Sequence, residues 1–286
     1  MEQIRKEFRP IQNKFINANG RLLSLQHPVV MGIVNITPDS FYAKSRAESI
    51  LDIKKIIEKM MEDGAGIIDL GGQSTRPGST EISFKEEAQR IQGVISSIRQ
   101  DFPDIAISID TYRTEIAKIA ISEGASMVND ISGGEFDATM FDYIAKNKIP
   151  YIMMHTGGKP QNMQNNPQYE NVVNEVFGSL IKKAMLLQSK GAVDILLDPG
   201  FGFGKTLEHN FELLDQLNVL SNCGFPILVG LSRKSMITKT LQISSVDALN
   251  GTSALHMIAL QNGASILRVH DVREAVECVK LWQQIP

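Results

Sequence analysis

The sequence has few cysteines and no long uncharged apolar run. Its 286 residues include two cysteines, Cys223 and Cys278, and neither lies in a motif. Two cysteines in a chain of this length cannot supply a disulfide framework, so both are expected to be reduced thiols. The N-terminus lacks the apolar core of a signal peptide, and no apolar run is long enough to cross a membrane. We therefore expect a soluble, cytoplasmic protein.

The chain also has little net charge and no dedicated metal motif. Its formal net charge is −3 and its pI is near 6.0, which argues against a general attraction to nucleic acid or to acidic membranes. Any polyanionic small molecule would have to be held by locally placed Arg and Lys. The motifs H-E-x-x-H and C-x-x-C are absent, so no structural zinc is expected.

One short segment imitates a phosphate-binding motif. FGFGKT, residues 201–206, resembles the end of a P-loop, but Pro199 stands where that motif requires a glycine. We therefore interpret Lys205 as a solvated loop lysine, although it could still touch an anion.

The sequence does contain a regular alternation of short apolar runs and longer amphipathic segments. The apolar runs are β-branched or almost continuously apolar, as is typical of parallel strands covered on both faces. There are eight of them, at residues 29–36, 66–71, 105–110, 126–131, 150–155, 194–200, 226–232 and 265–270. The amphipathic segments predict helices, among them single helices over 83–100 and 208–220.

Eight such β–α units predict a (β/α)8 TIM barrel, an α/β fold of a single domain over residues 1–286. A doubly wound open sheet remains the alternative, because the pattern alone does not show whether the sheet closes. No linker or break in composition indicates a second domain. Residues 1–27 precede the first predicted strand and are expected to form a lid over the N-terminal end of the barrel.

Polar residues occupy the carboxyl ends of almost all the predicted strands, where a (β/α)8 barrel carries its active site. They are Asn35, Asp69, Asp110, Asn129, Asp130, His155, Asp198, Ser232, Arg233, Lys234, Arg268 and His270. A charge in an otherwise apolar strand is costly unless it is paired or bound to a ligand. A structural ion pair explains one such residue as well as a ligand does, but seven strand ends of eight together favour a binding site.

The charges at these ends are sorted into two kinds. Acceptors and an amide, suited to the donor-rich edge of a heterocycle such as a 2-aminopyrimidinone, come from Asp110, Asn129 and Asp198. Cationic donors, suited to phosphates or carboxylates, come from Arg76, Lys234, Arg268 and His270. The sequence therefore predicts a ligand with a polar ring at one end and an anion at the other.

Eight stretches in fixed order carry a family resemblance that runs from about residue 29 to 284. They are VMGIVNITPDSF, IIDLGGQSTRPGS, SIDTYR with MVNDISGG, YIMMHTGGKPQNMQ, LLDPGFGFGKTLEHN, LVGLSRKSMI and RVHDV. Together they resemble the dihydropteroate synthase family of pterin-binding enzymes. The resemblance implies a (β/α)8 barrel, usually as a homodimer, that acts as a transferase in folate biosynthesis. It would condense 6-hydroxymethyl-7,8-dihydropterin pyrophosphate with p-aminobenzoate and release 7,8-dihydropteroate and pyrophosphate.

The same resemblance implies roles for individual residues. The pterin would be bound by Asp110, Asn129, Met154, Asp198, Lys234 and Arg268. The pyrophosphate would be bound by Asn35, Arg76, Arg268 and His270. The p-aminobenzoate would be bound by Phe41, Thr75, Pro77, Lys234 and Ser235. Mg²⁺ would bridge phosphate oxygens, with Asn35 as its one direct protein ligand. The residues nearest the chemistry would be Arg76, Asp110, Lys234 and Arg268.

The implied reaction is substitution at the pterin CH₂–O bond. Departure of pyrophosphate would leave a ring-stabilised methylene cation, which the arylamine attacks, so we predict neither a general base nor a covalent nucleophile. The sequence departs from the family at Ala43, where most members carry an Asp in the first loop. Two alternatives stay open: a non-catalytic pterin-binding barrel, to which Ala43 points, and a pterin-dependent methyltransferase, which would share the barrel and the pterin pocket.

Overall fold

The predicted strands form one closed parallel sheet. The computed structural model describes residues 15–36, 46–74, 79–159, 161, 163–164 and 167–285. Within these residues eight parallel strands follow the order β8-β7-β6-β5-β4-β3-β10-β9. Their bounds are β3 (Val29–Asn35), β4 (Ile67–Gly71), β5 (Ala106–Asp110), β6 (Met127–Asp130), β7 (Tyr151–Met154), β8 (Ile195–Asp198), β9 (Leu228–Val229) and β10 (Ile266–Val269).

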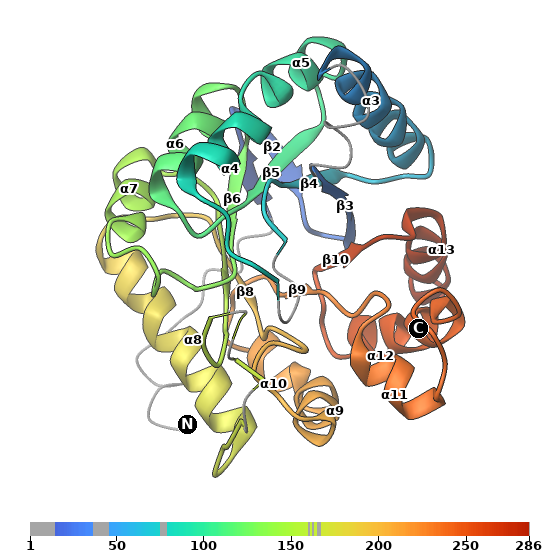
Figure 1. Cartoon of the computed structure of the whole chain (residues 1–286). Helices are drawn as coiled ribbons and strands as arrows, with labels where there is room; N and C mark the ends of the chain where they lie inside the picture. Colours follow the sequence, from blue (N-terminus) through green and yellow to red (C-terminus); the bar gives the residue numbers. More distant parts are fainter. Residues whose placement is uncertain are drawn as a thin grey trace.

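The two end strands of this order meet, so the sheet is a barrel and the open-sheet alternative is wrong. Leu197 next to the end of β8 forms a parallel bridge with Ile227, and its N–H donates to the carbonyl oxygen of Pro226 at 3.0 Å. Figure 1 shows the strands in the middle, with the helices arranged around them in chain order.

The helices lie on the outside of the barrel. They are α3 (Arg46–Glu62), α4 (Phe84–Ile91), α5 (Val94–Asp101), α6 (Thr114–Ser122), α7 (Met140–Asn147), α8 (Val172–Ser189), α9 (Leu207–Asp215), α10 (Leu217–Ser221), α11 (Ser235–Leu241), α12 (Leu249–Gln261) and α13 (Val272–Trp282). Among the residues that the structure describes, no helix is both long and apolar enough to span a bilayer.

Two predicted helices are each divided in two, and one predicted strand is much shorter than expected. The helix expected over 83–100 breaks at Gly93, whose φ of 77° is left-handed and whose N–H donates to Glu123 at 2.7 Å. The helix expected over 208–220 breaks at Gln216, which ends α9 and begins α10. Strand β9 keeps two residues, and the chain then turns into α11 with Arg233 at a φ of 56°.

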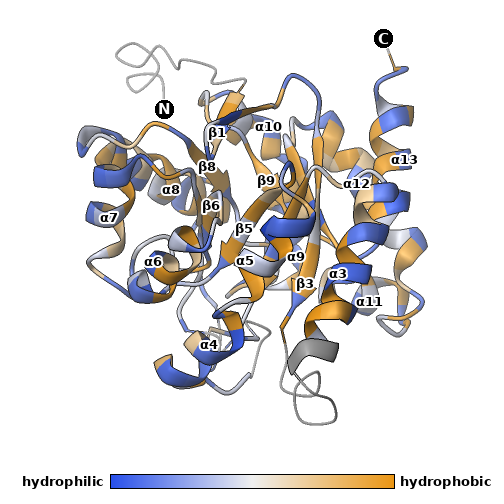
Figure 2. Cartoon of the chain, turned by 90° about the horizontal axis from the view of Figure 1, so that it is seen from above, coloured by the Kyte–Doolittle hydropathy of each residue, from blue (hydrophilic) through white to orange (hydrophobic). Residues whose placement is uncertain are grey.

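Alternate side chains of each strand point into the barrel and out toward the helices, as the period of a strand requires. One buried residue from each strand forms an inner cluster near the amino ends of the strands: Met31, Ile67, Ala106, Met127, Ile152, Leu196, Leu228 and Ile266. The neighbouring positions, such as Val30, Ile68 and Ile107, belong to the large outer cluster that packs under the helices. Hydrophobic colour is accordingly concentrated in the strands (Figure 2).

A hairpin at the start of the described chain covers the amino ends of the strands. Strands β1 (Phe15–Ala18) and β2 (Arg21–Ser24) pair antiparallel around a turn at Asn19 and Gly20, both with positive φ, as an Asn-Gly turn favours. Ile16 of β1 packs into the inner cluster. In Figure 2, β1 lies at the end of the barrel opposite α4. Because residues 1–14 lie outside the described residues, a lid over the whole of 1–27 stays a prediction, as does the single-domain organisation of the chain.

Candidate active site

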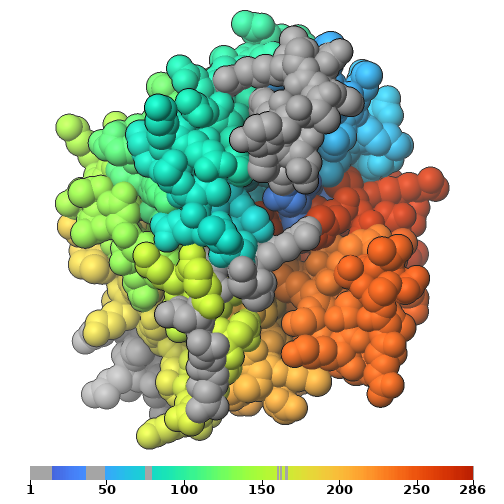
Figure 3. Space-filling model, viewed as in Figure 1, coloured from blue at the N-terminus to red at the C-terminus, as the bar shows by residue number. Residues whose placement is uncertain are grey.

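The inward positions of the strands change from apolar to polar toward the carboxyl ends. Asp69, Asn129, Asp198 and Arg268 each follow an inner-cluster residue by two positions, and Asp110 follows one by four. Because side chains alternate along a strand, all five point into the barrel above the apolar layer. We call Asp69, Asp110, Asn129, Asp198, Lys234 and Arg268 the polar ring. Figure 1 and Figure 3 show the molecule from this face.

Arg268 holds three other members of the polar ring together, two by direct hydrogen bonds and one through Asp69. Its Nε donates to Asp69 Oδ2 at 2.6 Å, and its Nη2 donates to Asp110 Oδ2 at 2.8 Å. Asp69 Oδ2 also accepts from Asn129 Nδ2 at 3.0 Å. The side chain of Asp69 is fully buried and that of Arg268 is 21% exposed, so this is a buried charge cluster with one cation beside two carboxylates.

The second oxygens of the two carboxylates have no hydrogen-bond partner among the described residues. Asp69 Oδ1 and Asp110 Oδ1 are both buried. A buried acceptor left without a donor costs about 1–3 kcal/mol, so these two atoms call for donors from a ligand or from water. Burial raises the pKa of Asp110 to about 7, although the nearby charge of Arg268 lowers it. The arrangement suits a ligand that presents N–H groups.

The opposite side of the polar ring is built on the loop after β8. Asp198 Oδ1 accepts from the N–H of Gly200 at 2.7 Å, and burial raises the pKa of this carboxyl while Lys234 opposes the rise. Lys234 comes from the loop between β9 and α11, and its Nζ donates to the carbonyl oxygen of Phe201. Burial lowers the pKa of Lys234 to about 8, with Asp198 acting in the other direction.

An apolar wall adjoins the polar ring. Met154, at the end of β7, is 3% exposed and packs with Tyr112, Ile131, Phe136 and Phe203. Lys234 Nζ lies 4.9 Å from the centre of the Phe203 ring. A flat apolar surface beside hydrogen-bonding groups is what the binding of an aromatic heterocycle requires.

The remaining predicted residues lie at the outer edge of this face or outside the described chain. Asn35 is exposed at the end of β3. Its Oδ1 and the Cβ of Asp110 would each lie 3.7 Å from a Cβ built on Gly71, so both side chains border this glycine. His270 is exposed, with its Nδ1 3.0 Å from Ser232 Oγ. Ser235 is exposed at the start of α11. The predictions for Phe41, Ala43, Thr75, Arg76 and Pro77 fall outside the described residues.

One interpretation from the sequence is wrong. Lys205 is 4% exposed and is no solvated loop lysine. Its Nζ lies within hydrogen-bond distance of the carbonyl oxygens of Gly200 at 3.0 Å and Phe203 at 2.9 Å and of His155 Nδ1 at 3.1 Å. Burial lowers its pKa to about 7, opposed by the charge of Asp198. The error arose because the glycine-rich loop folds back over its own lysine, which no local pattern reveals.

Sequence reasoning also gave no role to Asp69 or Arg113. Asp69 had been noted as a strand end, but its link to Arg268 joins residues far apart in the chain. Arg113 donates to Gln73 Oε1 at 3.3 Å and to Glu81 Oε1 at 3.0 Å, and it also binds the buried Glu87. It therefore ties together the two sides of the loop between β4 and α4.

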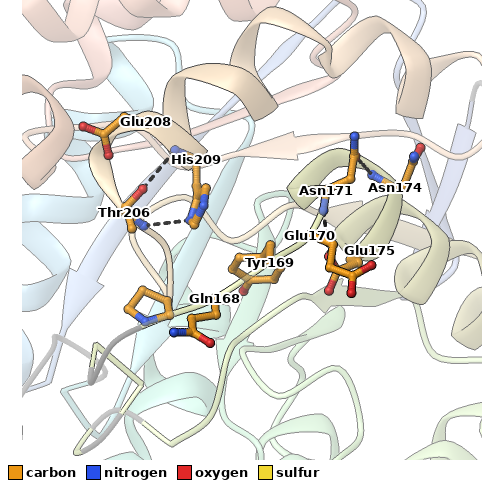
Figure 4. Close-up of a pocket in the computed structure, with 10 residues that line it drawn as sticks. Gln168, Tyr169, Glu170, Asn171, Asn174, Glu175, Thr206, Glu208 and His209 are labelled. Atoms are coloured by element: carbon orange, nitrogen blue, oxygen red, sulfur yellow. Dashed lines mark hydrogen bonds between the residues drawn. The ribbon is translucent and has the colours of Figure 1, made fainter.

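A separate cavity of about 960 Å³ lies near the outer rim, between the beginnings of α8 and α9. Figure 4 shows Tyr169 between the two helix ends, with Asn171 and Glu175 on one side and Thr206 and His209 on the other. No member of the polar ring lines this cavity. Its lining includes three glutamates and no lysine or arginine, which is unsuitable for an anionic ligand. We therefore place the candidate site at the polar ring.

Comparisons with known proteins show the family to which the chain is similar. Residues 31–270 match the model of a family described as pterin binding enzymes. The dihydropteroate synthase of Escherichia coli K12 is 41% identical over 266 residues, which cover 92% of this chain and 94% of that protein. The dihydropteroate synthase of Synechocystis is 44% identical over 261 residues, covering 89% and 90%. A solved structure of the Xanthomonas albilineans dihydropteroate synthase with 4-aminobenzoic acid matches at a TM-score of 0.86 and 35% identity, covering 96% of this chain and 99% of that one.

Proposed function

Because the chain belongs to the pterin-binding enzyme family, and within it to the dihydropteroate synthases of folate biosynthesis, we propose that the polar ring is where it binds its dihydropterin substrate. The observation that carries this proposal is the pair of buried, unpartnered oxygens on Asp69 and Asp110 beside the apolar wall of Met154. A flat ring with several N–H donors satisfies both features at once.

Four members of the polar ring and the adjoining Met154 have roles suited to the pterin. Asp198 accepts from the 2-amino group and ring N–H through the oxygen that does not bind Gly200. Asn129 hydrogen-bonds to the same edge, and Lys234 donates to the carbonyl side of the ring. Met154 packs on the ring face. Asp110 offsets the positive charge that develops on the pterin as the leaving group departs.

The pyrophosphate extends from the pterin toward the outer edge of the barrel mouth. Arg268 has five N–H donors, of which two are used on Asp69 and Asp110, so others remain for a phosphate oxygen. His270 and Asn35 lie at the same edge, and Arg76 completes the cationic set from the loop after β4. These donors stabilise the charge that accumulates on the departing pyrophosphate.

The residues at this edge suit Mg²⁺ as an ion shared with the substrate. The part of the chain that the structure describes contains no cluster of three His, Cys, Asp or Glu residues that could hold a metal alone. The amide oxygen of Asn35 is a hard, neutral ligand, and Mg²⁺ commonly takes one or two protein ligands with phosphate oxygens and water. When bound, Mg²⁺ would neutralise the leaving group's charge; Asn35 would hold it.

The p-aminobenzoate arrives on the side of α11. Ser235 and Lys234 are suited to its carboxylate, while Thr75, Pro77 and Phe41 would wall the ring. Its arylamine carries the lone pair that attacks the pterin methylene carbon, so the chain supplies position and charge rather than a base. We further propose a cytoplasmic, single-domain enzyme with residues 1–27 as its barrel lid, acting as a homodimer through its outer helices.

Release of pyrophosphate tests this function directly. Purified protein is mixed with dihydropterin pyrophosphate, p-aminobenzoate and Mg²⁺, and pyrophosphate and dihydropteroate are both measured. We expect the two products in equal amounts, and we expect neither when p-aminobenzoate is withheld. Pterin binding without any product would instead identify a non-catalytic barrel, as the replacement at Ala43 would suggest.

A further inference from the structure

The most deeply buried lysine near the site has no part in the function described above. Lys205 is 4% exposed, and its ammonium group is surrounded by three acceptors within 3.1 Å: Gly200 O, Phe203 O and His155 Nδ1. A fourth, the carbonyl oxygen of His155, lies at 3.4 Å. Burying an ammonium is costly unless acceptors surround it. The same hydrogen bonds hold the carbonyl groups of Gly200 and Phe203 and the ring of His155 in place.

One of these contacts leads directly to the polar ring. Lys205 Nζ donates to the carbonyl oxygen of Gly200, and the N–H of the same residue donates to Asp198 Oδ1 at 2.7 Å. The N–H that orients the Asp198 carboxylate and the carbonyl that Lys205 holds therefore belong to the two successive peptides joined at Gly200, so a shift of one moves the other. The free oxygen of Asp198 can meet a pterin edge only while these peptides keep their direction.

A second contact reaches Lys234. The carbonyl oxygens of Gly200 and Phe201 follow each other in the chain, and each accepts from a different lysine, Lys205 and Lys234 respectively. Lys205 thus holds the peptide next to the one on which Lys234 rests. Displacement of the loop after β8 would move both an acceptor and a donor of the polar ring together.

The backbone of this loop packs closely against the loop after β7. A Cβ on Gly200 would collide with the carbonyl oxygen of His155, and a Cβ on Gly204 would come within 2.7 Å of the Cα of Gly157. The loop after β8 therefore lies directly on the loop after β7 through glycines, without interlocking side chains at these points. Lys205 supplies a buried polar link between the two loops. The Tyr169 hydroxyl, which donates to Gly204 O at 2.9 Å, and Gln164 Nε2, which donates to Gly202 O, supply others.

We propose that Lys205 is a positioning residue for pterin binding: it links the loop after β8 to the end of β7 and so sets the directions of Asp198 and Lys234. The proposal rests on the proposed function of the polar ring as the pterin site. It assigns Lys205 no contact with the pterin, the pyrophosphate or p-aminobenzoate. Its effect should consequently be larger on pterin affinity, which depends on both Asp198 and Lys234, than on the use of p-aminobenzoate, which it reaches through Lys234 alone.

The test compares Lys205→Met, which keeps most of the length of the side chain but removes its donors, with Lys205→Gln, which keeps an amide donor. Lys190→Met is the matched control, because Lys190 is an exposed lysine paired with Asp142 on the outer helices. For each protein, calorimetry gives the Kd of a pterin without pyrophosphate, and steady-state kinetics gives the KM for p-aminobenzoate. Thermal unfolding identifies any variant that does not fold, in which case the Gln variant alone decides.

We expect Lys205→Met to raise the pterin Kd about tenfold or more, since the hydrogen bonds that hold the loop behind the binding groups are lost. The KM for p-aminobenzoate should rise by a clearly smaller factor than the pterin Kd, and Lys205→Gln should lie between wild type and Lys205→Met. A pterin Kd within about twofold of wild type in folded Lys205→Met or Lys205→Gln would overturn the proposal. Equal weakening of both substrates would overturn it as well. If wild-type protein bound no pterin, the proposed function itself would have failed, so the two failures are distinguishable.

Discussion

Removal of Arg268 should destabilise the fold, and should do so most at alkaline pH. The guanidinium is the cation that pairs with the buried carboxylates of Asp69 and Asp110. Removing one partner of a buried ion pair typically costs about 3–5 kcal/mol, because the other partner is left charged and unpaired. We expect a loss of this size in the free energy of unfolding of Arg268→Ala, measured by urea denaturation at about pH 8.

The pH dependence follows from Asp110. Burial has already raised its pKa from 3.8 to about 7, with Arg268 opposing the rise. Because the folded-state pKa lies above the unfolded one, stability is lost as pH rises from the unfolded value to the folded value. Without Arg268 the pKa of Asp110 in the folded state rises further, and the free energy of unfolding continues to fall above pH 7. The loss of unfolding free energy caused by Arg268→Ala, which we call its deficit, should therefore be larger at about pH 8 than at about pH 5.5, by about 1–2 kcal/mol.

Two further variants separate this explanation from general damage. In the background of Asp110→Asn, the pH-dependent part of the Arg268→Ala deficit should disappear, because the amide does not titrate. Arg273→Ala is the control, since this arginine pairs with Glu277 on the exposed side of α13 and should cost no more than about 0.5 kcal/mol. A deficit below about 1 kcal/mol, or one equal at both pH values, would refute the reasoning.

Three other predictions concern ligand binding. Asp198→Ala should weaken pterin binding at least about 100-fold in calorimetry, because two hydrogen bonds to a charged group, each of about 1.5–3 kcal/mol, are lost; an unchanged Kd would contradict the role of Asp198. The affinity for the pyrophosphate-bearing substrate should fall as pH rises through about 8, where the buried ammonium of Lys234 loses its proton, and a flat profile from neutral to alkaline pH would count against it. Removal of Mg²⁺ with EDTA should weaken the pyrophosphate-bearing substrate but not a pterin without pyrophosphate, and Asn35→Ala should reproduce that difference; equal effects on both ligands would place the ion elsewhere.

The strand pattern allowed the eight parallel strands and the gathering of their polar residues to be predicted. Each strand is buried on both faces, so its apolar run is visible in the sequence, and the carboxyl ends of parallel strands necessarily meet at one end of a barrel. Asp110, Asn129, Asp198 and Arg268 lie together for that reason. Closure of the sheet could not be predicted, because it depends on the contact between Leu197 and Ile227 across two strands.

Contacts between loops could not be predicted in the same way. The burial of Lys205 depends on how a glycine-rich loop returns over the end of β7, and the pairing of Asp69 with Arg268 joins the second and last strands of the barrel. Gly93 indicates the break in the 83–100 helix, and the Asn19-Gly20 pair indicates the turn of the hairpin; all three residues have positive φ. Each signal was local and weak beside the amphipathic pattern around it.

A crystal structure of the protein with a bound dihydropterin tests the central idea most directly. We expect the 2-amino edge of the ring within hydrogen-bond distance of Asp198 and Asn129, with one ring face on Met154 and the carbonyl side toward Lys234. Electron density for the pterin away from the polar ring, with Asp69 Oδ1 and Asp110 Oδ1 still lacking a donor from the ligand or from ordered water, would contradict it.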